Sequence, residues 1–183
     1  MVWSLGCGGE PGRRAGGTAL HRALAASRGP YPAGVGYEFD DDRDRVDLDA
    51  VWRFLSEEAY WGRFRTRDEV ELQIAGAWRV VGCYEADSGK LVGFARAVSD
   101  GVDIAYLADV FVVPEHRGRG LGVGLVETMI ESGSGADWRW LLHTRDAHGL
   151  YERFGFAPPD HRLLERPRGF SRSPRGSSED ETR

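Results

Sequence analysis

VFVVPEHRGRGLGVGL, residues 110–125, is the most informative stretch of this 183-residue chain. It begins as a run of β-branched residues, and Pro114 ends the run because proline cannot donate a hydrogen bond to a strand ladder. Alternating glycines follow, and apolar residues then repeat at helical spacing as far as Met129. The pattern predicts a strand over residues 104–113, a basic glycine-rich loop, and a helix over residues 120–132.

A glycine-rich loop at the start of a helix predicts an anion site. Glycine lets backbone N–H groups approach a ligand closely, and the helix dipole favours negative charge at this end. Arg117 and Arg119 add two permanent cations suited to phosphate. The alternative is an ordinary strand–turn–helix corner whose arginines are solvated.

The glycine spacing separates the known kinds of phosphate loop. A dinucleotide fingerprint would need glycine at 123 or 125, where Val123 and Leu125 stand. A nucleoside-triphosphate loop needs a lysine after its last glycine, and the only lysine in the chain is Lys90. The spacing does match R-x-x-G-x-G, at residues 117–122.

A second motif, TRDAHGLYERFGF, lies at residues 144–156. It predicts a short helix that Asp146 caps, that carries Tyr151, and that ends at a left-handed Gly155. In this order, the two motifs resemble those of the GCN5-related N-acetyltransferase (GNAT) superfamily. The resemblance spans roughly residues 37–166 and is to small single-domain members of bacterial type.

The resemblance implies that the donor is acetyl-coenzyme A and assigns residues to it. The backbone of the strand before the loop would pair with the pantetheine arm, through Phe111, Val112 and Val113. The loop would hold the pyrophosphate, through Arg117, Gly118, Arg119, Gly120, Leu121 and Gly122. Thr144 stands where the family often has an asparagine that contacts pantetheine, and its hydroxyl offers one hydrogen bond instead. Tyr151 resembles the general acid that protonates the departing thiolate.

The acceptor side is less clearly marked. Asp109 interrupts an apolar strand, which makes it a candidate for the catalytic base at the site of the substrate amine, and related sugar-amine acetyltransferases carry an acidic residue there. His143 or a chain of water molecules is the alternative base. The alternative is a structural aspartate, hydrogen-bonded to a loop or paired with Arg96. His143, at a predicted strand end, is a second candidate for this side. Tyr60 and Trp61 lie where the family places its substrate-covering loop, and they line a pocket or cap the core.

These assignments predict an N-acetyltransferase that needs no metal and acts on a primary amine of a small molecule, by direct attack. A protein N-terminus or lysine is the alternative acceptor. A non-catalytic module that senses acetyl-coenzyme A is the alternative function, although a pure binder has no need of the proton donor Tyr151.

Composition and net charge indicate the compartment and the classes of partner. The net charge of -5 disfavours a nucleic-acid partner, and no apolar run is long enough to span a membrane. Two cysteines without metal-ligand spacing suit a reducing cytoplasm. We expect a cytoplasmic monomer or homodimer.

The chain divides into three predicted zones. Residues 1–35 form a flexible extension, residues 36–166 the acetyltransferase domain, and residues 167–183 a disordered tail. Within the domain, strands are predicted at residues 37–40, 78–85, 91–98, 104–113, 138–143 and 161–166. Helices are predicted after Asp47, after the capping box that begins at Thr66, over 120–132, and around Tyr151. The fold class is α+β, and the resemblance implies a mixed, mostly antiparallel sheet with splayed central strands and flanking helices.

Overall fold

The computed structural model describes residues 36–166, so the predictions for residues 1–35 and 167–183 lie outside the described residues. The chain divides into two compact units at Thr144, and the first carries the sheet. In the described part of the chain, no helix is long and apolar enough to cross a membrane.

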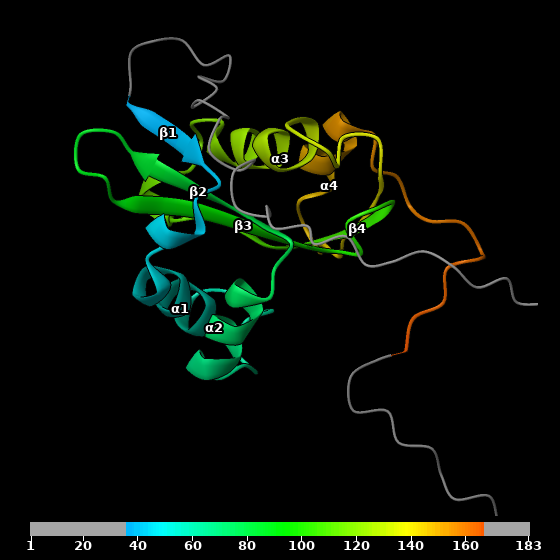
Figure 1. Ribbon diagram of the computed structural model, residues 1–183, viewed down its shortest axis with the longest axis horizontal. Helices are drawn as coiled ribbons and strands as arrows, with labels where there is room; N and C mark the ends of the chain where they lie inside the picture. The colour runs from blue at the N-terminus through cyan, green and yellow to red at the C-terminus, as the bar shows by residue number, and fades with distance from the viewer. Residues whose placement is uncertain (1–35, 167–183) are drawn as a thin grey trace, which may run out of the picture. The chain divides into compact units, whose positions relative to one another are not determined.

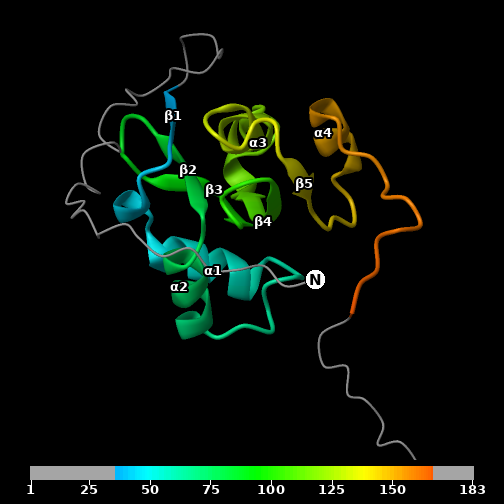
Figure 2. The same cartoon turned by 45° about the vertical axis from the view of Figure 1, so that its right-hand side comes forward.

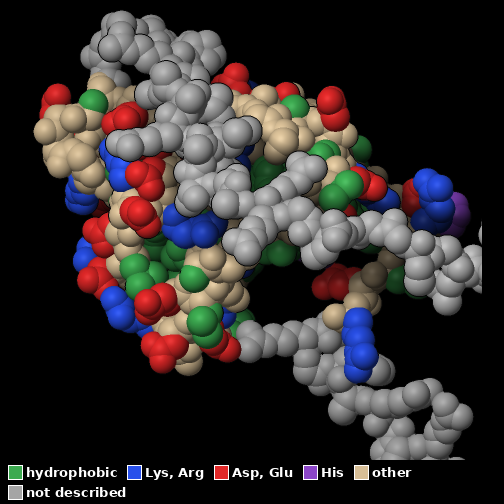
Figure 3. Space-filling model, in the orientation of Figure 1, with side chains coloured by type: hydrophobic (Ala, Val, Ile, Leu, Met, Phe, Trp, Pro, Cys, Tyr) green, Lys and Arg blue, Asp and Glu red, His purple; other side chains and the backbone are tan. Residues whose placement is uncertain are grey.

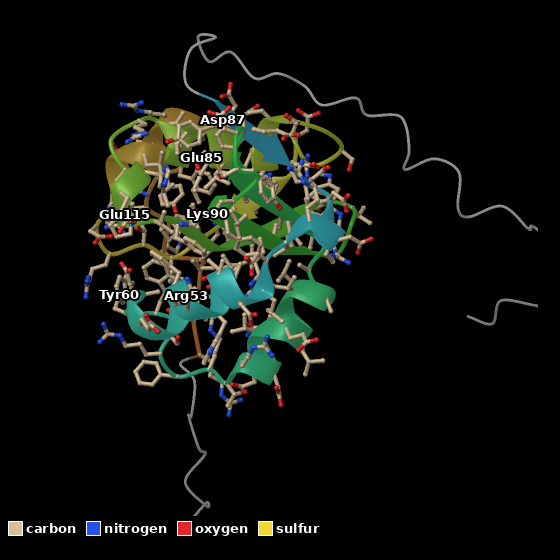
Figure 4. The ribbon with its side chains drawn as sticks, turned by 90° about the vertical axis from the view of Figure 1, so that its left-hand side faces the viewer. Arg53, Tyr60, Glu85, Asp87, Lys90 and Glu115 are labelled. Carbon is tan, nitrogen blue, oxygen red and sulfur yellow. The ribbon has the colours of Figure 1, made fainter. Side chains whose placement is uncertain are left out.

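The first unit is built on a five-stranded sheet whose strands follow one another in chain order. The strands are β1 (Tyr37–Asp40), β2 (Arg79–Glu85), β3 (Leu91–Ser99), β4 (Ile104–Val112) and β5 (Arg139–Leu141). Neighbouring strands are antiparallel except β4 and β5, which are parallel, so the predicted mixed sheet is confirmed. Figure 4 shows Glu85, Asp87 and Lys90 gathered at the hairpin between β2 and β3.

Helices cover both faces of this sheet. α1 (Leu48–Glu57) and α2 (Arg67–Ala75) lie on one face, and α3 (Leu121–Glu131) lies on the other (Figures 1 and 2). Asp47 caps α1 by accepting a hydrogen bond from the amide of Ala50. Thr66 and Glu69 form the predicted capping box at the start of α2. Both helix starts are therefore as the sequence predicts.

The core beneath α1 and α2 is aromatic and aliphatic. Phe54 of α1 stacks on Phe111 of β4, with ring centroids 4.0 Å apart, and Val51 and Leu55 are fully buried beside them. Burial of such side chains is worth about 1.5–3 kcal/mol each, so this contact fixes α1 on the sheet. On the opposite face a Cβ at Gly93 would lie 3.1 Å from Leu125, so α3 packs closely there.

β4 contains a bulge. Phe94 of β3 pairs with Phe111, whereas Arg96 pairs with Ala108, which places one extra residue in β4. Asp109 lies in this bulge with a φ of 52°, a left-handed value that aspartate tolerates better than most residues. The bulge turns the Asp109 side chain toward the face that α1 and α2 cover, where it meets Arg96.

The second unit corrects two predictions. α4 spans His148–Tyr151 and continues as a 3₁₀ turn to Phe154, and the left-handed Gly155 (φ 79°) ends it as predicted. Its N-cap is Ala147, not Asp146, and no side chain caps it. Residues 161–166 form no strand, because the adjacent Leu163 and Leu164 break the alternation that a half-buried strand needs. In the first unit, the strand predicted over residues 138–143 is shorter, because β5 spans only Arg139–Leu141.

Candidate active site

The glycine loop has the geometry that an anion site requires. Gly118 and Gly120 have φ values of 76° and 80°, a left-handed conformation that glycine adopts without strain. Gly120 is the N-cap of α3, and since it has no side chain, it cannot itself cap the first amides of the helix through a side-chain acceptor. A Cβ at Gly118 would meet nothing within 4 Å, so the loop is open on that side. The loop therefore offers backbone donors to a phosphate group.

The two loop arginines are held by the strands beside them. The Arg117 Nε donates to the Val112 carbonyl oxygen at 2.9 Å, and Arg119 donates to the Tyr37 hydroxyl at 2.7 Å. That hydroxyl also lies 2.8 Å from Nδ1 of His116. No sequence motif marks Tyr37, which lies far upstream in β1, so its contact with the loop could not be predicted from the sequence.

β4 has an open edge next to this loop. Its parallel ladder with β5 covers only Ile104 to Tyr106, so the described strands separate beyond this point. The Val113 amide donates to Val92 of β3 at 2.9 Å, and in an antiparallel ladder the groups of Val112 then point to the opposite edge. This edge is suited to pair with an extended ligand. Separated strands are what the resemblance implies.

His143 and Thr144 follow β5 just after the ladder ends. Nδ1 of His143 lies 2.7 Å from the hydroxyl of Tyr106, a residue of β4. The contact fixes the imidazole at the point where the two strands separate. His143 is a candidate predicted from the sequence, whereas Tyr106 fits the alternation of an ordinary strand and no sequence pattern marks it.

Asp109 is buried and held by two arginines. Arg65 forms a bidentate pair with both carboxylate oxygens at 2.8 Å, and the Arg96 Nε donates to Oδ2 at 2.6 Å. Burial opposes ionisation of this carboxyl group, but the hydrogen bonds and charges of Arg65 and Arg96 outweigh it and lower its pKa. The pairing with Arg96 is the structural alternative that the sequence left open.

Tyr60 and Trp61 lie in the connector between α1 and α2 (Figure 4 labels Tyr60). Their exposed fractions are 37% and 40%, and their rings meet edge to face with centroids 4.9 Å apart. Neither ring is therefore buried in the core. Gly62 follows them, and a Cβ there would lie 2.2 Å from the carbonyl oxygen of Leu55.

Tyr151 belongs to the second unit. It is the last residue of α4, its side chain is buried, and its ring meets Phe156 edge to face at 5.8 Å. In the first unit, Figure 3 shows acidic and basic side chains interspersed over the visible surface.

Comparison with known proteins identifies the family. Residues 78–158 match the acetyltransferase (GNAT) domain family. A protein of Gibberella zeae named as an acetyltransferase is 30% identical over 130 residues, which cover 69% of this chain and 70% of that protein.

Solved structures agree. A GNAT-family acetyltransferase from Xanthomonas campestris pv. campestris is 35% identical with a TM-score of 0.67, and the match covers 73% of this chain and 95% of that one. An acetyltransferase from Clostridium acetobutylicum, solved with acetyl-CoA, shares the fold at 16% identity and a TM-score of 0.54, with 73% and 96% covered. The chain belongs to the GNAT family and is an N-acetyltransferase.

Proposed function

We propose that this enzyme transfers the acetyl group of acetyl-CoA to a primary amine of a small molecule. The observation that carries the proposal is the glycine-lined start of α3, with left-handed Gly118 and Gly120, beside the open edge of β4. The first offers donors to a pyrophosphate, and the second offers strand-like pairing to a pantetheine arm. The fold that this chain shares with the acetyl-CoA complex from Clostridium acetobutylicum is consistent with this donor.

The residues assigned to the donor follow from this arrangement. The amides of residues 118–122 hold the pyrophosphate, and the Val112 backbone meets the pantetheine. Arg119 is held by Tyr37 and Arg117 by the Val112 carbonyl, so both guanidinium groups are positioned before the ligand arrives. Preorganisation of this kind lowers the entropic cost of binding.

A buried, unreactive Cys83, with its pKa raised by burial to about 12, suits a cytoplasmic enzyme.

We assign the acceptance of the amine proton to His143 in preference to Asp109. Asp109 accepts hydrogen bonds from two arginines, and its lowered pKa makes it a poor proton acceptor. The Tyr106 hydroxyl orients the His143 imidazole, and in the tautomer whose Nδ1 donates to Tyr106, Nε2 is the proton-accepting nitrogen.

The reaction is a direct transfer. The amine nitrogen attacks the thioester carbonyl carbon, a C–N bond forms, and the C–S bond breaks. The amine proton passes to His143, and the sulfur takes a proton from the Tyr151 hydroxyl, which the family resemblance assigns as general acid. A phenol, with an ordinary pKa near ~10, is suited to protonate a thiolate.

Release of free thiol from acetyl-CoA, measured against a panel of amines, tests the proposal. Tyr151→Phe keeps the ring but removes the transferable proton, so turnover should fall about 100-fold with little change in acetyl-CoA affinity. His143→Gln should also lower turnover and leave calorimetric acetyl-CoA binding intact. Near-full turnover by Tyr151→Phe, with only a loss of thermal stability, would make Tyr151 a packing residue.

A further inference from the structure

The cluster of Arg65, Asp109 and Arg96 carries more positive charge than its own hydrogen bonds use. Two guanidinium groups meet a single carboxylate, and the three side chains are 10%, 5% and 11% exposed. Within residues 36–166, no other acidic side chain pairs with either arginine. Arg65 has one further acceptor, the neutral Oε1 of Gln73, at 2.7 Å. The cluster therefore retains one positive charge.

Donors in this cluster also lack acceptors. The Arg65 Nε is buried and, among the described residues, has no hydrogen-bond partner. Among the described residues, the Arg96 side chain makes one hydrogen bond, from Nε to Asp109 Oδ2, and its terminal nitrogens have no acceptor there. A buried donor without a partner, such as the Arg65 Nε, costs free energy, and an acceptor atom supplied by a ligand would remove that cost.

The position of the cluster in the fold connects it with the binding of the acceptor. Asp109 lies in the β4 bulge, three residues before Val112, whose backbone faces the proposed pantetheine edge. Arg65 belongs to the α1–α2 connector that also carries Tyr60 and Trp61. Arg96 lies on β3, on the same side of the sheet as these residues. The net charge thus lies beside the strand that would present the thioester.

We propose that the Arg65–Asp109–Arg96 cluster binds an anionic group of the acceptor, so that the preferred substrates are amines that also carry a carboxylate, such as amino acids. This rests on the proposed function and narrows its substrate class. Asp109 then spaces and orients the two arginines, and the incoming carboxylate supplies the second negative charge. Guanidinium is suited to this task because it binds carboxylates through paired donors.

Matched acceptors test the proposal: phenylalanine against phenethylamine, and lysine against cadaverine, each with saturating acetyl-CoA. We expect kcat/KM to be about 10- to 100-fold higher for the carboxylate member, the usual effect of a charged hydrogen bond. Arg96→Gln should reduce this ratio to near one, because the bidentate Arg65–Asp109 pair survives and the net charge is lost. Arg65→Gln is the second variant and should act alike.

Arg63→Gln is the matched control, because it removes the same charge from an exposed residue of the same connector. It should keep the wild-type ratio. Equal or lower kcat/KM for the carboxylate members, or a ratio unchanged in Arg96→Gln, would overturn the anion site, while amine turnover would leave the proposed function intact.

If no amine is acetylated, the proposed function fails and binding decides the anion site. Calorimetric titration of N-acetylphenylalanine against its amide should then show a preference for the acid that Arg96→Gln abolishes. Equal binding of the two compounds would overturn the anion site.

Discussion

A substitution at Gly122 should affect cofactor binding and helix stability in opposite directions. It lies in the first turn of α3, inside the helix, where alanine is favoured over glycine by about 0.8–1 kcal/mol. Gly122→Ala should therefore keep or raise the melting temperature, yet weaken acetyl-CoA binding by about 1–2 kcal/mol, since the added Cβ obstructs close approach of the phosphate. Calorimetry and thermal melts measure the two effects. Thr128→Ala, later in α3, is the control; unchanged affinity in Gly122→Ala would exclude the loop as donor site.

The ionised carboxylate of Asp109 stabilises the fold, and this contribution is lost as the pH falls. Its folded pKa is lowered, so its ionic contribution is present above the unfolded value near ~3.9 and is lost as the pH falls through the folded pKa. Asp109→Asn should cost about 3–5 kcal/mol at neutral pH, because it leaves two buried arginines without a counter-charge. The difference from wild type should shrink below about pH 4.

Urea unfolding at several pH values measures this dependence. Asp41→Asn is the matched control, because Asp41 pairs with Arg79 from a half-exposed position, and such pairs contribute about 1 kcal/mol or less. A constant difference between wild type and Asp109→Asn across the acid range would mean that folding leaves the pKa of Asp109 unchanged.

At this scale the sequence predicts well where local chemistry determines the structure. Asp47, Thr66 and Gly155 act on neighbouring backbone, and all three do in the structure what their types predict. The Arg65 pairing could not be predicted, because its partner lies 44 residues away and meets it only through the bulge. The role of Tyr37 is hidden for the same reason.

The connector between α1 and α2 is an element whose shape depends on one glycine. A Cβ at Gly62 would overlap the Leu55 carbonyl at 2.2 Å and its carbonyl carbon at 2.8 Å, and this backbone belongs to α1. Gly62→Ala should thus move the connector and cost about 1–3 kcal/mol of stability, the usual cost of overpacking. It should raise the KM of the acceptor and leave acetyl-CoA affinity unchanged.

Steady-state kinetics and calorimetry distinguish these effects for Gly62→Ala. Gly89→Ala is the control for a specific effect on acceptor binding, because Gly89 lies in the β2–β3 hairpin with open space around it. Its left-handed φ of 67° predicts that alanine lowers the stability, without any change in acceptor KM. An acceptor KM that rises equally in both variants would indicate general destabilisation.

The order of helices and strands is predictable over residues 37–132, because there the spacing of apolar residues and the positions of turn-forming residues indicate the same elements. The prediction fails for residues 161–166 and is too long for β5, where short segments carry weak periodicity. Strand separation at β4 and β5 is a property of pairing between distant segments. The family resemblance implies this separation, whereas no local sequence pattern predicts it.

At the scale of the whole molecule, the length of the Xanthomonas relative predicts which residues the fold needs. The match takes up 73% of this chain but 95% of that protein. A variant lacking residues 1–34 and 168–183 should therefore keep its melting temperature and its acetyl-CoA affinity. Both segments also lack the apolar periodicity with which to dock. A large loss of stability would show that one of them packs as part of the domain.

The bulge in β4 has a consequence at the level of the gene. Phe111 and Val112 stay opposite Phe94 and Gly93 whether or not the extra residue is present, because a deletion of Val110 would simply close the ladder. Asp109 would then fall opposite Ala95 and turn to the face that α3 covers, away from both arginines. Loss of a single codon would thus dismantle the proposed anion site and destabilise the fold, because both buried arginines would lose their counter-charge, while β4 keeps its register beside the proposed cofactor edge.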